Sequence, residues 1–264
     1  MSTVSVAEQE FAGRVAIVVG GSSGIGFHAA LLLAQRGADV TIFADRGVDE
    51  AVASAASRHI RLEGVTGDAS SSAVMKQAID RIAVERGGLH IAVHTACIHP
   101  YGNAGDTSEE VWDRVMAVNL KSAFLLAHHS LPHMLRQRNG AIVNVSSIQG
   151  SGCQRDVSAY STSKAALLGF TRTLAVDYSS MGIRANSVSP GSIRTPLLDV
   201  AVDKFSPGQD KEQVFANWGA GVPAGRIGEP EEVAEVIAFA ASERASYCSG
   251  SEFVVDGALR IKLN

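Results

Sequence analysis

The chain has 264 residues, 46% of them apolar and 19% charged, so it is long and apolar enough to fold around a sizeable core. Its formal charge of −4 comes without any long run of lysine and arginine, which argues against nucleic acid or an anionic membrane as the main partner. Cys97, Cys153 and Cys248 lie far apart and outside any C-x-x-C pattern, so the sequence indicates neither a disulfide framework nor a metal site.

The first elements read as a strand over residues 14–19, a glycine-rich turn, and a helix over 27–37 that ends at a glycine. The alternation then continues, with expected strands at 38–44, 60–65, 89–96, 141–147, 183–191 and 251–257, and expected helices at 48–57, 71–87, 109–137, 159–182 and 231–242. Apolar strands that alternate with helices predict an α/β, doubly wound, mostly parallel sheet between two helix layers.

No internal repeat or Pro/Gly/Ser-rich linker divides the chain, which predicts a single domain over residues 1–264. Residues 1–14 contain no apolar signal-peptide region, and no later stretch reaches the roughly 18 continuous apolar residues of a membrane helix. We therefore expect a cytoplasmic protein that works on small molecules.

Ligands of a doubly wound sheet bind beyond the carboxyl ends of its strands. Polar or glycine-rich residues follow several expected strands: Gly20–Gly26, Asp45, His94–Tyr101, Ser147 and Pro190–Thr195. Residues 196–228 interrupt the alternation with proline, glycine and scattered large apolar side chains. We expect that segment to form a partly helical flap over the crevice.

The turn VGGSSGIGF places Gly20, Gly24 and Gly26 between a strand and a helix, where glycine permits the close approach of a pyrophosphate. Asp45 follows Gly26 by nineteen positions, near the ~20-residue spacing at which an acidic side chain meets the adenosine ribose. Its carboxylate would repel a 2′-phosphate, whereas the adjacent Arg46 could attract one. We therefore expect NAD, with NADP not excluded.

The stretch SAYSTSKAALLGF puts Tyr160 and Lys164 four positions apart, on one face of an expected helix. A nearby ammonium favours the phenolate and lowers the pKa of a tyrosine from its usual value near ~10, which suits proton transfer. Because a four-residue spacing is a short match, a solvated tyrosine and lysine on an amphipathic helix is the alternative interpretation.

Several motifs occur together in order: GGSSGIG, Asn119 in AVNLKSAF, Ser147 in VNVSSIQG, the YSTSK segment and SPGSIRTP. They resemble the short-chain dehydrogenase/reductase family over about residues 11–257, and Ser147 precedes Tyr160 by thirteen residues as the family arranges it. The resemblance implies a Rossmann-like, seven-stranded enzyme that moves a hydride between nicotinamide and an alcohol or ketone carbon.

The resemblance also implies roles for individual residues. Tyr160 would be the general acid/base, and Lys164 would lower its pKa and hold the nicotinamide ribose. Ser147 would bind the substrate oxygen and Asn119 a water that links Lys164 to solvent, although a turn residue and a helix irregularity are the competing interpretations. Asp68 would reach adenine or would simply cap a helix. Further cofactor contacts implied are Ser22, Ser23, Ile25, Ala96, Pro190, Gly191, Ile193 and Thr195.

Two places depart from the family pattern. Val19 stands where the family usually has threonine, which removes a hydroxyl that ties the first turn to the neighbouring strand. His94, Thr95 and Cys97, in HTAC, stand where the family usually has N-N-A-G, which puts cofactor affinity in doubt. We expect His94 to be packed and Cys97 to be a small buried hydrophobe.

The side chains expected to face the substrate are polar: His99, Tyr101, Gln149, Gln154 and Arg155. They favour a sugar, a polyol or another polar substrate. A 3-oxoacyl thioester reductase is the alternative enzyme, although the acidic balance and Asp45 speak against a carrier-borne substrate and NADPH. A dinucleotide sensor without turnover, motivated by Val19 and HTAC, is the alternative outside enzymes.

The resemblance further implies a homotetramer or homodimer, built through the helices that contain Asn119 and Tyr160. The apolar stretches 234–242 and 253–264 are compatible with a second partner surface near the C-terminus.

Overall fold

A computed structural model describes residues 9–262 of the chain. The expectations made for the N-terminal stretch 1–14 and the C-terminal stretch 253–264 therefore fall partly outside the described residues, at 1–8 and at 263–264. Within residues 9–262, no helix combines the length and apolar character needed to cross a membrane.

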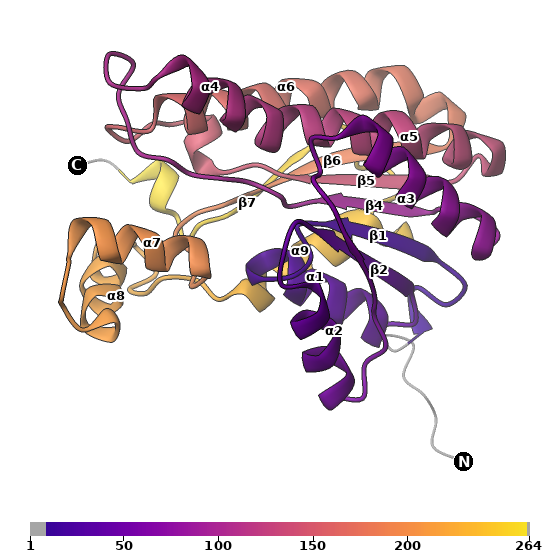
Figure 1. Cartoon of the computed structure of the whole chain (residues 1–264), viewed down its shortest axis with the longest axis horizontal. Helices are drawn as coiled ribbons and strands as arrows, with labels where there is room; N and C mark the ends of the chain where they lie inside the picture. The colour runs from indigo at the N-terminus through magenta and orange to yellow at the C-terminus, as the bar shows by residue number, and fades with distance from the viewer. Residues whose placement is uncertain (1–8, 263–264) are drawn as a thin grey trace.

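Seven strands form one sheet in the order β3-β2-β1-β4-β5-β6-β7, and every neighbouring pair is parallel (Figure 1). The order reverses at β1, which lies between β2 and β4. The strands are β1 (Val15–Val19), β2 (Asp39–Ala44), β3 (Glu63–Thr66), β4 (Ile91–His94), β5 (Gly140–Val145), β6 (Ile183–Pro190) and β7 (Glu252–Val255). The predicted doubly wound sheet is confirmed.

Helices cover both faces of the sheet (Figure 1). The α1, α2 and α9 helices pack on one face and α3, α5 and α6 on the other, with α4 beside α6. The helices are α1 (Gly24–Gln35), α2 (Val48–Ser57), α3 (Ser72–Glu85), α4 (Glu109–Met116), α5 (Ser122–Gln137), α6 (Ser158–Tyr178), α7 (Pro196–Phe205), α8 (Lys211–Ala220) and α9 (Pro230–Ala241).

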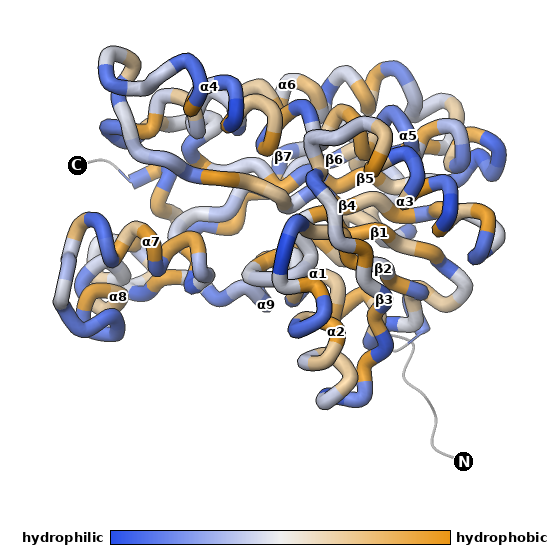
Figure 2. Tube along the Cα trace, viewed as in Figure 1, coloured by the Kyte–Doolittle hydropathy of each residue, from blue (hydrophilic) through white to orange (hydrophobic). Residues whose placement is uncertain are grey.

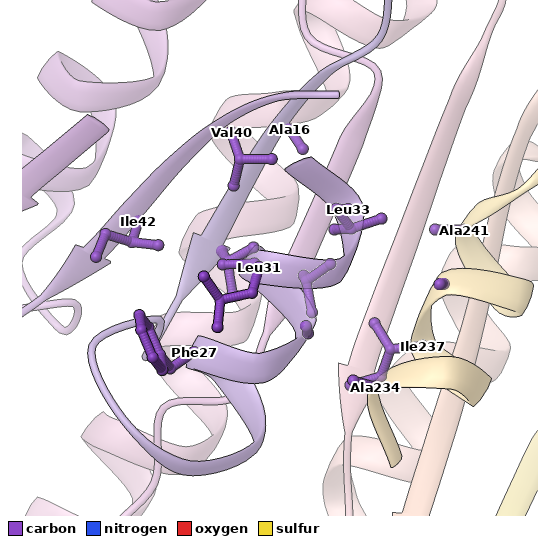
Figure 3. Packing of buried hydrophobic residues seen from close by; sticks show 14 of the residues in the cluster. Ala16, Phe27, Leu31, Leu33, Val40, Ile42, Ala234, Ile237 and Ala241 are labelled. Atoms are coloured by element: carbon purple, nitrogen blue, oxygen red, sulfur yellow. The ribbon is translucent and has the colours of Figure 1, made fainter. Parts of the chain in front are cut away.

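Each central strand contributes side chains to the hydrophobic clusters on both faces of the sheet, because successive side chains point to opposite faces. In β1, Ala16 and Val18 join the cluster beneath α1 and α9, while Ile17 and Val19 join the cluster beneath α3 and α5. Figure 3 shows the first cluster, where Leu31 of α1 lies across from helix α9. The strands at the centre of the sheet form the continuous hydrophobic stretches of Figure 2, as expected for strands buried on both faces.

The predicted helix over 109–137 is not one regular helix. Helix α4 ends at Met116, a π-helical segment covers Ala117–Lys121, and α5 begins at Ser122. The segment widens one turn of the helix around Asn119, whose side chain binds the backbone of Ile98 instead of facing solvent. Helical spacing in the sequence cannot separate a regular turn from this wider one, which depends on a contact with a distant loop.

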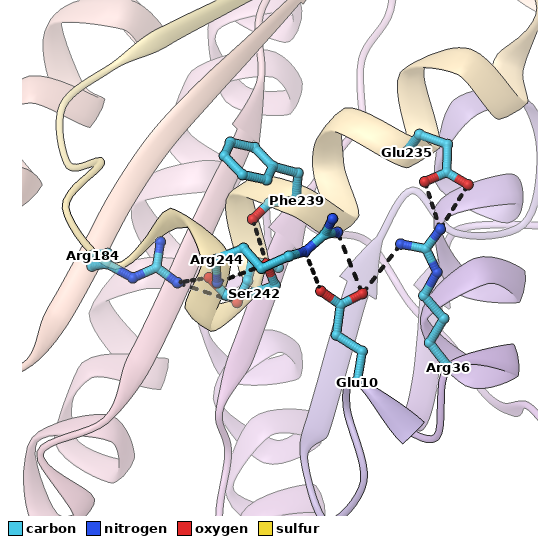
Figure 4. Close-up of polar contacts among 8 residues, drawn as sticks. Glu10, Arg36, Arg184, Glu235, Phe239, Ser242 and Arg244 are labelled. Carbon is cyan, nitrogen blue, oxygen red and sulfur yellow. Dashed lines mark hydrogen bonds and ion pairs between the residues drawn. The ribbon is translucent and has the colours of Figure 1, made fainter. Parts of the chain in front are cut away.

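An ion-pair cluster ties the start of the described chain to α1 and α9 (Figure 4). The Glu10 carboxylate accepts from Arg36 at 3.2 Å and from Arg244 at 2.7 Å, and Arg36 also pairs with Glu235 of α9. Arg184 of β6 donates to the carbonyl groups at the end of α9. This cluster lies near the amino ends of the strands, at the opposite edge of the sheet from the glycine-rich turn.

Helices α7 and α8 stand apart from the two main layers, at the left of Figure 1, and have a small apolar cluster of their own. Val202 of α7 packs there with Val214 and Phe215 of α8. The chain enters and leaves this segment at one place, because Arg194 N donates to Gly228 O and Gly228 N donates to Ser192 O, both at 2.9 Å. We call residues 196–228 the flap, as in the sequence analysis.

Candidate active site

A cavity of about 1260 Å³ opens at the carboxyl ends of the strands, between the glycine-rich turn and the flap. Most residues expected in the site line it. They are Gly20, Ser22, Ser23, Gly24, Ile25, Gly26, Asp45, Arg46, Asp68, Ala96, His99, Tyr101, Ser147, Gln149, Gln154, Tyr160, Lys164, Pro190, Gly191, Ile193 and Thr195. Two do not: Asn119 is buried behind the wall, and Arg155 is exposed outside it.

At Gly20 and Gly26 the glycine-rich turn lies too close to neighbouring backbone atoms to accommodate a side chain. A Cβ on Gly20 would lie 2.5 Å from Ala96 N, and a Cβ on Gly26 would lie 2.3 Å from Gly20 O; Gly20 and Gly24 also have positive φ angles of 84° and 52°. No described side chain caps the first turn of α1, and the residues of that turn line the cavity. An uncapped helix N-terminus in a glycine cradle fits the pyrophosphate of a dinucleotide.

The hydroxyl missing at Val19 is replaced from the other side. Thr95, directly after β4, donates its hydroxyl to Val19 O at 2.9 Å, and its backbone N–H donates to the same oxygen at 2.8 Å. The Thr95 side chain therefore adds a tie between the end of β1 and the loop after β4, and because it uses the backbone oxygen of Val19 it does not depend on the Val19 side chain. Sequence reasoning treated the two positions separately because the bond joins residues 76 positions apart.

His94 and Cys97 have different environments. His94 is fully buried, as predicted, and its Nε2 lies 2.6 Å from the Ser122 hydroxyl. Burial, with a smaller effect of Lys164, lowers the pKa of His94 to about 3, so the ring is neutral at physiological pH. The expectation for Cys97 is wrong in one respect: the residue is only partly buried, because its side chain lines the cavity.

Acidic and basic side chains meet the cavity at the ends of β2 and β3. Asp45 and Arg46 are both exposed there, with Arg46 Nε 3.9 Å from Asp45 Oδ1. Asp68 accepts from the Ser70 hydroxyl at 2.7 Å and from the Ser70 amide at 2.8 Å, and these bonds lower the pKa of Asp68. Asp68 therefore fixes the turn before α3 but does not cap the helix, whose N-cap residue is Ser71, so the capping interpretation is wrong. Its contact with adenine stays a prediction.

Tyr160 and Lys164 lie on one face of α6, as their spacing predicts. Lys164 is fully buried, its Nζ donates to Val145 O at 2.8 Å, and the same atom lies 5.6 Å from the centre of the Tyr160 ring. Desolvation lowers the pKa of the lysine. The solvated-helix alternative is wrong, because both side chains are buried.

The sequence predicted a lowered pKa for Tyr160, whereas in the structure of this chain the pKa is raised. Burial raises the pKa of Tyr160, the neighbouring Cys97 adds to the increase, and the Ser147 hydroxyl acts in the opposite direction. Spacing along a helix places an ammonium near a phenol, but it does not reveal how far both groups are removed from water.

Ser147 follows the end of β5 by two residues, at the rim of the cavity. Its hydroxyl accepts from Gln149 N at 3.1 Å and caps the short 3-10 helix Ile148–Gly150. The preceding Ser146 donates its hydroxyl to Lys164 O at 2.9 Å, which fastens α6 to the strand end. The Ser147 side chain thus shapes the turn and also faces the cavity beside Tyr160.

Asn119 joins three segments behind the wall of the cavity. Its amide donates to Ile98 O and to the Ser163 hydroxyl, both at 3.0 Å, and its Oδ1 accepts from Ile98 N at 2.8 Å. Ser163 is the neighbour of Lys164 on α6. Direct bonds therefore occupy the Asn119 amide group, and the role in a water connection stays a prediction.

Aromatic rings connect Tyr160 to the flap. His99 stacks on Tyr160 with ring centroids 3.9 Å apart, Tyr101 follows His99 at 4.6 Å, and Phe205 of α7 meets the edge of Tyr101 at 4.8 Å. The His99 Nε2 atom is buried and has no hydrogen-bond partner among residues 9–262. Burial, with a smaller effect of Lys164, lowers the pKa of His99 to about 4.

Several lining residues escaped the sequence analysis. Arg114 of α4 reaches Asp68 at 3.4 Å, and Arg260 comes from the 3-10 helix Leu259–Ile261 after β7. Apolar side chains of the flap complete the wall: Leu197, Leu198, Val200, Phe205 and Trp218. No local pattern marks these residues, although the flap was expected as a unit. Across residues 9–262 the structure contains no cluster of three or more histidine, cysteine or acidic side chains that could hold a metal ion.

The family model described as "Enoyl-(Acyl carrier protein) reductase" matches residues 19–259. The chain is 36% identical to a cyclohexanol dehydrogenase of Acinetobacter sp. over 97% of this chain and 99% of that protein. It is 39% identical to a cis-4-hydroxycyclohexanecarboxylate dehydrogenase of Sinomonas cyclohexanicum over 94% and 97% of the two chains.

Among solved structures, the chain is similar to the aldohexose dehydrogenase of Thermoplasma acidophilum in its ligand-free form. The TM-score is 0.89, with 33% identity over 97% of each chain. The glycine cradle, the Tyr160–Lys164 pair and these likenesses lead to one conclusion: the chain belongs to the short-chain dehydrogenase/reductase family and is an NAD(P)-dependent oxidoreductase of alcohols and ketones.

Proposed function

We propose that Tyr160, Ser147 and Lys164 carry out the proton chemistry of this oxidoreductase. In alcohol oxidation the Tyr160 phenolate takes the hydroxyl proton, and in ketone reduction the phenol returns it to the carbonyl oxygen. The Ser147 hydroxyl donates to that same oxygen and stabilises the charge that develops there. The observation that carries this proposal is that all three side chains line one cavity, with Lys164 Nζ 5.6 Å from the Tyr160 ring.

Lys164 and Asn119 act as supporting residues in this proposal. The bond from Lys164 Nζ to Val145 O orients the ammonium, whose charge opposes the effect of burial on Tyr160. Asn119 holds Ile98 and Ser163 and so keeps the β4 loop and α6 in register beside the reacting groups. Lys164 would also hold the ribose of a bound nicotinamide.

For the cofactor we propose NAD. Bound NAD supplies the site that accepts or returns the hydride. The turn of Gly20 to Gly26 would hold its pyrophosphate, Asp45 its adenosine ribose and Asp68 its adenine. The residues Ser22, Ser23, Ile25, Ala96, Pro190, Gly191, Ile193 and Thr195 complete its binding site. Support comes from their common position on the cavity wall, and from Asp45, whose exposed carboxylate lines the cavity at the end of β2 and would repel a 2′-phosphate.

The substrate we propose is a polar alcohol or ketone, such as a sugar, a polyol or a cyclic secondary alcohol with polar substituents. His99, Tyr101, Gln149 and Gln154 supply hydrogen-bonding groups, and the apolar side chains of the flap supply a surface for a ring face. Arg155 has no part in this proposal, since it lies outside the cavity. A 3-oxoacyl thioester reductase is the less favoured candidate. Such an enzyme needs a basic surface for its carrier-borne substrate, and the net charge of −4 does not favour one.

We further propose that the enzyme works in the cytoplasm as a homodimer or homotetramer. The three cysteines are free thiols, which suits a reducing compartment. Phe124 of α5 and Val176 of α6 are exposed apolar side chains on the helices expected to join the subunits. The apolar stretch 234–242 gives less support, because most of it packs within the chain against α1.

The test is a turnover screen with NAD and NADP in parallel against cyclic secondary alcohols, aldoses and polyols. Tyr160→Phe is expected to lower kcat by about 10²- to 10⁴-fold while NAD still binds. Tyr178→Phe, at the end of α6 and outside the cavity, is the matched control and should keep wild-type activity. Unchanged turnover in Tyr160→Phe would exclude the proposed general acid/base.

A further inference from the structure

Arg260 lies at the substrate end of the cavity, on an element that is separate from the glycine-rich turn and from the segments that carry Ser147 and Tyr160. It belongs to the 3-10 helix Leu259–Ile261, which follows β7 and lines the cavity together with Ser147 and Tyr160. Its backbone N–H donates to Asp256 Oδ2 at 2.7 Å, which fixes the start of this short helix.

The guanidinium is held beside the loop that carries Ser147. One nitrogen, Nη1, donates to the Ser151 hydroxyl at 2.9 Å and to Glu252 Oε1 at 3.2 Å. Ser151 follows Ser147 by four residues across one 3-10 turn, Ile148–Gly150, so the guanidinium is bound to the far end of the short loop that begins at Ser147.

The Nε and Nη2 edge of the Arg260 guanidinium has N–H donors that no described residue accepts. Arginine carries five N–H donors, and among residues 9–262 only Nη1 of Arg260 has hydrogen-bond acceptors. Nε and Nη2 form a planar edge that matches the two oxygens of a carboxylate. Glu252 and Ser151 hold the side chain from one side and so orient this edge without occupying it.

The charges that line the cavity are divided between its two ends. Its acidic residues, Asp45 and Asp68, lie at the ends of β2 and β3, in the part assigned to the adenosine. No acidic residue of the described chain lines the end near Ser147, where the cations are Arg260 and the buried Lys164, which is bound to Val145. An anionic substituent is therefore attracted to Arg260, whose charge is offset in part by the Glu252 carboxylate 3.2 Å behind it, outside the lining of the cavity.

We propose that Arg260 binds a carboxylate of the substrate, so that the alcohol oxidised here is a cyclic hydroxy acid whose hydroxyl lies at Tyr160. This inference rests on the proposed function and narrows its substrate class. Arg260 is a specificity-determining residue in this view: it anchors the far end of the ring, while Ser147 and Tyr160 hold the reacting oxygen.

The kinetic test compares two alcohols that differ only in the carboxylate, cis-4-hydroxycyclohexanecarboxylate and cyclohexanol. Arg260→Gln is expected to lower kcat/KM for the acid by about 10- to 100-fold and to leave kcat/KM for cyclohexanol within about threefold. Arg260→Lys should recover part of the loss, since it keeps the charge but not the planar edge. Arg81→Gln, an exposed position on α3 outside the cavity, is the charge-matched control.

A second variant tests the ion pair between Arg260 and Glu252 by changing Glu252. Glu252→Gln removes the internal carboxylate that competes for Arg260, so kcat/KM for the acid should rise by about two- to fivefold with no change for cyclohexanol. Equal effects of Arg260→Gln on the two alcohols, or no effect on either, would overturn the assignment.

A binding measurement separates this inference from the proposed function. Calorimetry with cyclohexanecarboxylate and NAD should show binding to the wild type and to Arg81→Gln, and at least about tenfold weaker binding to Arg260→Gln. If the wild type turns over neither alcohol, the proposed substrate class is contradicted. The role of Arg260 is then decided by the binding measurement alone. Equal binding of the carboxylate to wild type and Arg260→Gln would refute that role.

Discussion

The imidazole ring of His99 covers the phenol ring of Tyr160, with centroids 3.9 Å apart and ring planes inclined by 31°. Burial raises the pKa of Tyr160, so removal of this cover should let water reach the phenolate and lower that pKa. In His99→Ala the acid limb of the kcat/KM profile for alcohol oxidation should move by about 0.5 to 1 pH unit toward lower pH.

The matched variant for that experiment is His99→Phe, which keeps a ring over Tyr160 and should keep the wild-type profile. His99 itself has a pKa of about 4 and is neutral above about pH 5, so its own charge does not enter the profile there. An unmoved acid limb in His99→Ala would show that the ring does not control hydration of the phenol.

Asp45 is expected to determine the choice of cofactor. In Asp45→Ala the repulsion of a 2′-phosphate disappears while Arg46 remains, so the ratio of kcat/KM for NAD to that for NADP should fall by about 10- to 100-fold. Asp49→Ala, an exposed position on α2 outside the cavity, is the control. Steady-state kinetics with both cofactors gives the ratio, and an unchanged ratio would remove Asp45 from the ribose site.

The Thr95 hydroxyl should contribute measurably to the first turn. Thr95→Val removes the bond to Val19 O, and we expect the free energy of unfolding to fall by about 1 kcal/mol and NAD to bind more weakly. Thr95→Ser keeps the hydroxyl and should stay close to the wild type. Urea unfolding and NAD titration of the three proteins check both effects, and equal behaviour of the valine and serine variants would contradict the role of the bond.

His94 should make the fold sensitive to mild acid. Its pKa is about 3 in the folded chain and near 6.5 when unfolded, so the unfolded state binds a proton first as the pH falls. The stability lost between pH 7 and pH 5 from this residue is about 2 kcal/mol, and below pH 3 the loss is complete. His94→Asn, the residue of the family pattern, should lose less stability over that range in unfolding experiments at a series of pH values. Parallel losses in both proteins would rule out this origin.

Phe124 is expected to lie at a subunit contact. The residue is 47% exposed and its ring packs against His128 on the same helix, with centroids 5.4 Å apart. Phe124→Asp should therefore shift the oligomer toward monomer in light scattering. Val84→Asp, on α3 and with 79% of its residue surface exposed, should leave the assembly intact. Equal masses for the two variants would place the contact elsewhere.

Patterns local in the chain predicted much of this molecule. Alternating apolar runs and helical spacing located the sheet and its layers, since the apolar pattern of an element such as β1 or α6 lies within its own residues. The glycine turn and the Tyr160–Lys164 pair likewise have short, fixed spacings. What the sequence did not reveal depends on distant contacts: the bond of Thr95 to Val19, the π-helical turn around Asn119, and the place of Arg260 at the cavity.

The flap leaves and rejoins the rest of the fold at one point, where Ser192 and Arg194 pair with Gly228. Its own apolar cluster, formed around Val202 and Phe215, does not depend on the two clusters of the sheet. Away from these ends the flap contacts the rest of the fold through Phe205 on Tyr101 and through the bond from Ala224 N to Gly257 O, so a replacement that keeps these contacts should leave the sheet unchanged. Exchange of the flap between relatives should transfer the apolar part of the substrate pocket while the proton-transfer residues stay where they are.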